Sequence, residues 1–224
     1  PMAQMVLLCA MPGMGKSRLA QEFLRGLSMR GVDVTVMRGN GDPLNRGTPY
    51  AMLAQVLRRL CGIQEGEPLA VQRDKLRARV EPLFPDVAAL APSAMTPGGA
   101  SPRSRVTHFL GELAGVPFPD GENSQLRAAR GDSKGMADQV GRALVDFLQA
   151  LSQEKPVVLV LEDLHWGDAQ SVKLIDTALH SLNEAPLLVL ALARPEVHSV
   201  FAQLRSAKVQ EVNLVGLGRR ASER

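Results

Sequence analysis

Five short apolar runs, separated by stretches with helical periodicity, constrain the fold of this chain most strongly. The runs span residues 4–10, 32–38, 157–162, 187–193 and 209–215. The first, third and fourth are almost continuously hydrophobic, which is typical of parallel strands buried on both faces, whereas the second and fifth are less apolar and suit the edges of a sheet. Because the stretches between them carry apolar residues every three or four positions, strands and helices are expected to alternate. The sequence therefore predicts an α/β fold, a three-layer sandwich around a five-stranded parallel sheet.

The long segment between the second and third runs interrupts this alternation. It contains several helix patterns, so we predict a helical insertion at about residues 50–150, between strands 2 and 3. Two stretches within it, 91–104 and 115–135, are rich in Pro, Gly and other turn-forming residues and are expected to be loops. The chain as a whole, 1–224, is interpreted as one domain core, cut at both ends from a longer protein.

A glycine-rich motif follows the first apolar run and precedes a helix pattern. The stretch "AMPGMGKS" fits the phosphate-binding loop G-x-x-x-x-G-K-S/T, except that Ala10 replaces the first glycine. Gly13 and Gly15 allow a turn whose N–H groups face phosphate oxygens, Lys16 can reach the β- and γ-phosphates, and the Ser17 hydroxyl can bind Mg²⁺. The alternative is a chance match in a glycine-rich turn. The predicted ligand is ATP or ADP with Mg²⁺, and the residues expected to bind it are Ala10, Pro12, Gly13, Met14, Gly15, Lys16, Ser17 and Arg18.

Two adjacent carboxylates end the third apolar run, in the stretch "VVLVLEDLHWGD". The carboxyl ends of parallel strands meet at one edge of a sheet, so both acids should face the phosphate loop. By position, Glu162 would hold Mg²⁺ together with Ser17, and Asp163 would activate the attacking water. Most ATPases with this loop have Asp first and Glu second, and we hypothesise that the reversed order slows turnover. Asp168 is expected to cap the following helix.

An arginine ends the fourth apolar run. Arg194 could contact the γ-phosphate from the side opposite Lys16, or it could be a surface residue paired with Glu196 or Glu162. Lys16, Glu162, Asp163 and Arg194 are the predicted catalytic residues. In the insertion, Arg127 and Arg130 could approach a phosphate in a closed state, or could belong to a solvated basic turn.

Composition and motifs argue against several classes of partner and of enzyme. A net charge of +3 and an aromatic content of 4% make nucleic acid an unlikely partner for this segment. No apolar run reaches the roughly 18 residues that a membrane helix needs, so no membrane partner is expected. Cys9 and Cys61 lack a metal-binding spacing and are expected to be buried reduced thiols of a cytoplasmic protein. Motifs of proteases, esterases and protein kinases are absent from the sequence.

Taken together, four stretches resemble the signal-transduction ATPases with numerous domains (STAND), and more narrowly an AAA-type, Orc1-like ATPase module. Such modules occur in LuxR-type transcription regulators, adenylate cyclases and multidomain bacterial serine/threonine kinases. The spacing and sequence of the motifs are most similar to those of the kinase-linked group. The stretches are "AMPGMGKSRLAQEF", "DPLNRGTPYAMLAQVLR", "VVLVLEDLHWGDAQSVKLIDTAL" and "VLALARPEV".

This resemblance implies a sheet in which the acidic strand lies beside the second strand and the phosphate-loop strand is central. It implies that Lys16 and Ser17 bind phosphate and Mg²⁺, that Glu162 and Asp163 form the acidic pair, and that Arg194 is a sensor. Members of the family switch between closed and open states through ATP binding and slow hydrolysis, and other domains of the same chain, such as a kinase or helical repeats, are the expected partners. Besides Ala10, the chain departs from the family in lacking the upstream adenine-contacting segment and the helical lid after residue 224.

The leading hypothesis is therefore a slowly hydrolysing ATP switch within a larger bacterial signalling protein. The alternatives are a DNA-linked Orc1-like AAA ATPase, a non-hydrolysing nucleotide-binding scaffold and, least favoured, a small-molecule kinase.

Overall fold

A computed structural model describes residues 2–45, 47–84, 101–121, 123–206 and 208–214. Its centre is one parallel sheet of five strands in the order β2-β3-β4-β1-β5. The strands are β1 (Gln4–Cys9), β2 (Thr35–Asn40), β3 (Val157–Glu162), β4 (Leu187–Ala193) and β5 (Val209–Asn213). The predicted α/β class and parallel sheet are confirmed. The two less apolar runs, β2 and β5, form the edges as expected, and β3 lies beside β2.

Two details of the sheet differ from expectation. The second strand was predicted over 32–38 but begins at Thr35, because Gly31 adopts a left-handed φ of 69° and the Val32 N–H closes the preceding helix on the Leu27 carbonyl. It continues to Asn40 because it stays paired with β3 as far as Glu162. The phosphate-loop strand β1 is an interior strand, but β4 and not β1 occupies the middle of the sheet.

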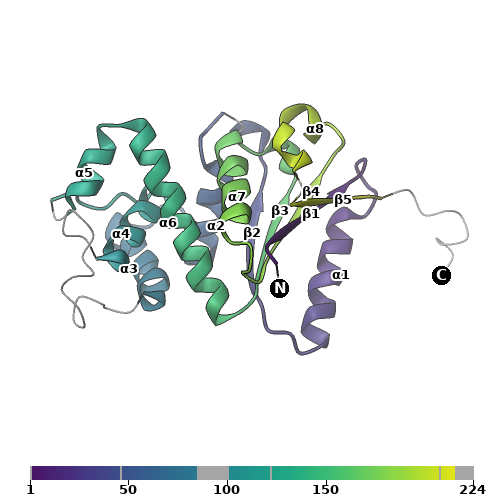
Figure 1. Cartoon of the computed structure of the whole chain (residues 1–224), viewed down its shortest axis with the longest axis horizontal. Coiled ribbons are helices and arrows are strands. Elements are labelled where there is room, and N and C mark those ends of the chain that lie inside the picture. Colours follow the sequence, from purple (N-terminus) through teal and green to yellow (C-terminus); the bar gives the residue numbers. More distant parts are fainter. Residues whose placement is uncertain (1, 46, 85–100, 122, 207, 215–224) are drawn as a thin grey trace, which may run out of the picture.

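Helices cover both faces of the sheet, which gives the predicted three layers (Figure 1). One face is covered by α1 (Lys16–Met29), and the other is covered mainly by α2 (Ala51–Leu60), α6 (Ser133–Glu154) and α7 (Ala169–Ser181). Successive residues of a strand face opposite layers, so Leu159 belongs to the larger core while its neighbour Val160 belongs to the smaller core under α1. Burial on both faces explains why β3 and β4 are almost entirely apolar in sequence.

The helical insertion lies between β2 and β3 and comprises α2, α3 (Leu69–Val80), α4 (Pro102–Ala114), α5 (Ser124–Arg130) and α6. Of these, α3, α4 and α5 lie at the end of the molecule remote from α1, whereas α2 and α6 also pack on the sheet (Figure 1). The prediction that 115–135 is a loop was partly wrong, because Asn123 and Asp132 cap α5 and α6 through their side chains. Of the other predicted loop, 91–100 lie outside the described residues, and 102–104 open α4.

Short helical turns complete the described chain: η1 (Pro43–Asn45), η2 (Glu81–Leu83), η5 (Leu164–Trp166), α8 (Val197–Val200) and η6 (Ala202–Arg205). Among the described residues, no helix combines the length and the apolar character needed to cross a membrane. The predicted fifth strand ends at Asn213, and the terminal "GRRASER" lies outside the described residues.

Candidate functional site

The loop between β1 and α1 has the backbone that its glycines predicted. Gly13 and Gly15 have φ values of 78° and 83°, in the left-handed region that side chains other than glycine rarely adopt. Ala10 is not among the described residues with positive φ, and its buried backbone N–H donates to the Ala193 carbonyl at 3.2 Å. Alanine is therefore compatible with this position without backbone strain, and the departure from the motif leaves the loop intact.

Lys16, the first residue of α1, folds back over this loop. Its Nζ donates to the carbonyl oxygens of Ala10 at 2.8 Å and Met11 at 3.1 Å. The helix has Gly15 at its N-cap and receives no side-chain cap, so the free N–H groups of its first turn and its positive dipole end point toward the loop. The loop, the ammonium group and the helix end together form a site suited to an anion.

Ser17 and Glu162 meet across the site although they lie far apart in sequence. The Ser17 hydroxyl donates to Glu162 Oε2 at 3.1 Å. A hydroxyl and a carboxylate oxygen are hard ligands of the kind that Mg²⁺ prefers. The two residues predicted to share a metal ion are thus brought together by the start of α1 and the end of β3.

Asp163 follows Glu162 with a left-handed φ of 48°. Aspartate tolerates this conformation better than most residues, because its short polar side chain can bond locally. The end of β2 packs closely here: a Cβ on Gly41 would lie 2.2 Å from the Asp163 carbonyl oxygen. The backbone of Asp163 therefore has a conformation that is uncommon for residues other than glycine, and the close approach of Gly41 leaves little room for it to change.

A cavity of about 390 Å³ is lined by most of the predicted site residues, but Ala10 and Glu162 are not part of its lining. Asp163 and Arg194, which directly follow β3 and β4, line it together with the loop and the start of α1. Its lining consists of Pro12, Gly13, Met14, Gly15, Lys16, Ser17, Arg18, Asp163 and Arg194. The side chain of Arg18 also forms an exposed ion pair with Glu22 at 2.7 Å.

Arg194 stacks on an aromatic ring at the edge of this cavity. Its guanidinium carbon lies 4.9 Å from the centroid of Trp166, and its backbone N–H donates to His165 Nδ1 at 3.4 Å. Among the described residues, the ion pairs recorded include none between Arg194 and either Glu196 or Glu162. The surface-pairing alternative is therefore not the arrangement found.

His165 and Asp168 follow Asp163 closely in the chain, and both side chains are buried. Burial lowers the pKa of His165, and its Nε2 has no hydrogen-bond partner among the described residues. Asp168 is buried and caps α7 through the Ser171 N–H at 2.8 Å, which confirms the predicted cap. It also accepts hydrogen bonds from the Tyr50 and Met52 N–H groups at 2.9 and 3.1 Å, so this one carboxylate caps the N-terminal ends of both α7 and α2.

The cap of α2 by Asp168 was not foreseen. The helix α2 begins at Ala51, and its N-cap, Tyr50, has a left-handed φ of 62° and no side-chain cap bond of its own. The signal available in the sequence was only that Asp168 can cap, not which second helix lies within its reach.

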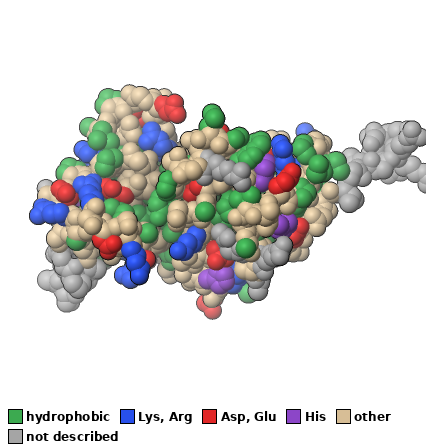
Figure 2. All heavy atoms as spheres, turned by 90° about the horizontal axis from the view of Figure 1, so that it is seen from above, with side chains coloured by type: hydrophobic (Ala, Val, Ile, Leu, Met, Phe, Trp, Pro, Cys, Tyr) green, Lys and Arg blue, Asp and Glu red, His purple; other side chains and the backbone are tan. Residues whose placement is uncertain are grey.

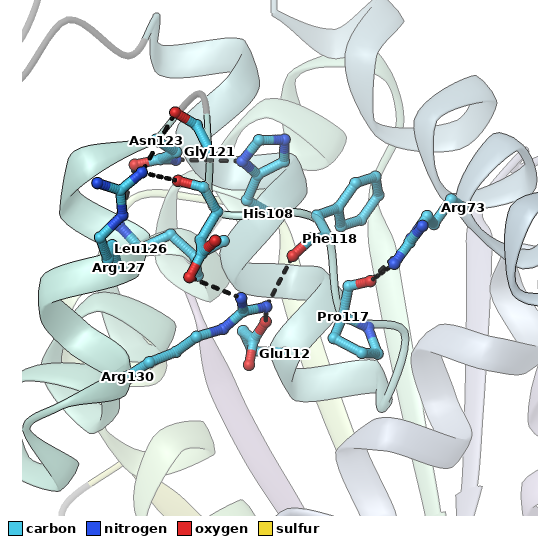
Figure 3. A network of polar contacts seen from close by, with 11 residues as sticks. Arg73, His108, Glu112, Pro117, Phe118, Gly121, Asn123, Leu126, Arg127 and Arg130 are labelled. Atoms are coloured by element: carbon cyan, nitrogen blue, oxygen red, sulfur yellow. Dashed lines mark hydrogen bonds and ion pairs between the residues drawn. The ribbon is translucent and has the colours of Figure 1, made fainter.

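Arg127 and Arg130 belong to a polar network inside the insertion and not to the cavity (Figure 3). Arg130 donates to Glu112 Oε1 at 2.6 Å and to the Phe118 carbonyl at 2.7 Å, and Arg127 donates to the Asp120 carbonyl at 3.3 Å. Both arginines therefore hold the segment between α4 and α5, which neither the phosphate-contact nor the solvated-turn interpretation had described.

Comparison with known protein families shows the family of this chain. Residues 1–190 match the AAA ATPase domain. The chain belongs to this family. AAA ATPase domains bind ATP or ADP with Mg²⁺, so the chain is a nucleotide-binding ATPase domain, and the anion site at the head of α1 with the oxygen pair of Ser17 and Glu162 fits such a ligand.

Two further similarities are more limited. A stretch of 68 residues is 32% identical to a protein of Rhizobium meliloti (strain 1021) described as uncharacterized, and it covers 30% of this AAA domain chain and 7% of that protein. The chain thus spans a small part of that relative. Among solved structures, VirB4 of Thermoanaerobacter pseudethanolicus is similar over 98% of this chain and 79% of its own, with 11% identity and a TM-score of 0.35.

Proposed function

We propose that this AAA ATPase domain is a slowly hydrolysing ATP switch within a larger bacterial signalling protein. The observation that carries the proposal is the convergence of Lys16, Ser17, Asp163 and Arg194 on one cavity, with Ser17 bonded to Glu162. Lys16 and Ser17 begin α1, and Asp163 and Arg194 directly follow β3 and β4. Each supplies a charge or an oxygen that a Mg²⁺-bound triphosphate requires.

Each residue receives a distinct role in this proposal. Lys16 and the loop N–H groups bind the β- and γ-phosphates, and Ser17 and Glu162 hold the Mg²⁺, which would neutralise phosphate charge. Asp163 orients and deprotonates the attacking water. Arg194 senses the γ-phosphate across the cavity from Lys16.

The self-contacts of Lys16 and Arg194 suggest how binding is transmitted. Lys16 now donates to loop carbonyls, and Arg194 stacks on Trp166. A phosphate would compete for both cations, because charge-assisted hydrogen bonds to an anion are stronger than bonds to neutral carbonyls or a ring. Release of Arg194 from Trp166 would then alter the segment that leads into α8, which is the switch we propose.

Two observations support the proposed signalling role: the sequences of the motifs and the length of the matched relative. The motif stretches resemble those of kinase-linked STAND modules, and the matched protein is far longer than this chain. Other domains of one long chain, a kinase domain and helical repeats among them, are the proposed partners. A DNA-linked role is less favoured: Figure 2 shows basic and acidic side chains interspersed on the face in view, with no continuous basic surface.

Nucleotide binding can be measured through the chain's single tryptophan. Trp166 contacts Arg194, so ATP binding to the full-length protein, or to its AAA domain if Trp residues elsewhere interfere, should change its fluorescence. Lys16→Ala should weaken binding at least tenfold, whereas Lys155→Ala, which removes an exposed ion pair with Asp33, should leave it unchanged. Equal affinity of the wild type and Lys16→Ala would refute the assignment of the phosphate loop.

Hydrolysis tests the order of the two acids. If the long Glu162 arm and the short Asp163 arm slow turnover, the double exchange Glu162→Asp with Asp163→Glu should raise the rate of phosphate release. Because Asp163 has positive φ, where glutamate is less tolerated, the single variant Glu162→Asp is the cleaner arm. A lower rate in both variants would contradict the hypothesis, and ATP binding with no turnover in the wild type would identify the non-hydrolysing scaffold instead.

A further inference from the structure

Three potential metal ligands from three separate elements meet behind the phosphate loop. Cys9 ends β1, His198 lies in α8 and Glu211 lies in β5. Their ligand atoms all lie within 4.8 Å of one another. The strand register explains the meeting: Glu211 is level with Leu7, and Leu7 and Cys9 point to the same face of the sheet. The cluster is therefore built by the β1–β5 pairing and closed by α8.

The donor set suits a borderline-soft divalent cation. A thiolate, an imidazole nitrogen and a carboxylate oxygen are the ligand types of zinc, whereas Mg²⁺ prefers oxygen alone. Tetrahedral zinc places its ligand atoms roughly 3.3–3.7 Å apart, so even a separation of 4.8 Å needs to shorten by only about 1.1–1.5 Å. His198 Nε2 and Glu211 Oε1, at 3.3 Å, already have such a separation.

The two ring nitrogens of His198 differ in their contacts. Nε2 of His198 contacts Glu211, but Nδ1 is buried and has no hydrogen-bond partner among the described residues. A buried polar atom without a partner is unusual in a folded protein. Coordination through Nδ1 would satisfy it, whereas coordination through Nε2 would use the nitrogen that already faces Glu211.

The three potential ligands differ in their exposure to solvent. Cys9 is 3% exposed. The other two ligands are partly exposed, with side-chain exposures of 24% for His198 and 36% for Glu211. An ion can thus enter from solvent, and water can take a fourth position, as in zinc sites with three protein ligands.

We propose that Cys9, His198 and Glu211 form a binding site for a zinc-class divalent metal ion. The ion would fasten the end of β1 to α8 and β5. Cys9 directly precedes Ala10 at the start of the phosphate loop, and α8 follows Arg194 after a short turn. Metal occupancy would hold together the two chain segments that border the nucleotide cavity, and it requires neither nucleotide nor Mg²⁺.

The test is a titration of the metal-free chain with Co²⁺ and then with Zn²⁺, in the absence of nucleotide and Mg²⁺. We expect one Co²⁺ per chain, with a thiolate-to-cobalt absorption band and visible bands of tetrahedral intensity, all displaced by Zn²⁺. Cys9→Ser should abolish the thiolate band, and His198→Gln should weaken binding at least tenfold. The matched controls Cys61→Ser and His180→Gln should change neither.

His198→Gln lies at a partly exposed position and guards against misfolding of the Cys9 variant. No tetrahedral cobalt spectrum, a thiolate band that survives Cys9→Ser, or weak binding that is equal in all four variants would overturn the proposal, the last result indicating an adventitious ion only. Because the readout is independent of ATP, its failure would leave the proposed ATPase function standing, and the reverse also holds.

Discussion

Asp168 allows the sharpest prediction about how this fold is held together. Its buried carboxylate accepts three backbone N–H groups: Ser171 at 2.8 Å in α7, and Tyr50 and Met52 at 2.9 and 3.1 Å at the start of α2. Removing a helix cap costs about 0.5–2 kcal/mol, and each buried donor left without a partner costs about 1–3 kcal/mol. These terms overlap and do not add fully. We expect Asp168→Ala to lower the free energy of unfolding by about 3–5 kcal/mol.

Asp168→Asn gives an intermediate step. The amide oxygen can keep the two bonds made by Oδ1, to Tyr50 and Ser171, but the amide nitrogen would then face the Met52 N–H, donor against donor. A loss of about 2 kcal/mol is expected, because one buried bond is replaced by a repulsive contact.

Urea unfolding followed by circular dichroism measures these changes as shifts of the midpoint at constant slope. The matched control is Asp132→Ala, which removes a single, exposed N-cap bond to Lys134 at 3.0 Å and should cost about 1 kcal/mol. If Asp168→Ala costs no more than this control, the double cap contributes nothing and the reasoning is refuted. ATP affinity should be unchanged in the folded Asp168→Asn variant, and a loss there would indicate a role in the site.

Three further outcomes follow from the structure. Gly111→Ala should destabilise by about 1–3 kcal/mol in urea unfolding, because its Cβ would lie 2.6 Å from the Phe118 ring, whereas Gly26→Ala, with nothing within 4 Å, should be neutral or stabilising. Since burial lowers the pKa of His165, the folded state binds fewer protons than the unfolded one; stability should be full above about pH 6.5 and fall below it, more so than in His165→Gln, as measured by urea midpoints at several pH values. Cys61 is partly buried and not fully buried as predicted, and this partial burial raises its pKa to about 11. Iodoacetamide at pH 8 should therefore modify it far more slowly than in urea, and equal rates by mass spectrometry would contradict this protection.

The loop geometry at the candidate nucleotide site could be predicted because its parts are local in sequence. Gly13, Gly15, Lys16 and Ser17 lie in one short loop and helix start, and their roles depend only on backbone freedom and on the direction of the helix. The position of Glu162 followed from one general rule, that the carboxyl ends of parallel strands share an edge. The hydrogen bond between Ser17 and Glu162 agrees with that prediction.

The contacts within the insertion could not be predicted in the same way. Arg130 looked like a member of a basic turn, because the sequence does not show that Glu112 and the Phe118 carbonyl lie within its reach. Asp168 was recognised as a cap of α7, yet its two bonds to α2 join residues 118 and 116 positions away. Such contacts depend on how α2 packs against β2 and α7, which is decided by tertiary packing and not by any local pattern.

The candidate metal cluster shows where the general rule about strand ends stops being sufficient. That rule brings Cys9 and β5 to neighbouring positions, but it does not say whether two side chains point to the same face. A shift of one residue in the β1–β5 register would turn Glu211 to the face under α1 and separate it from Cys9 and His198. Only the register, in which Glu211 is level with Leu7, places all three ligands together, and register in turn depends on packing along both faces of the sheet. A spacing search along the sequence therefore misses a site whose ligands are related by pairing between strands.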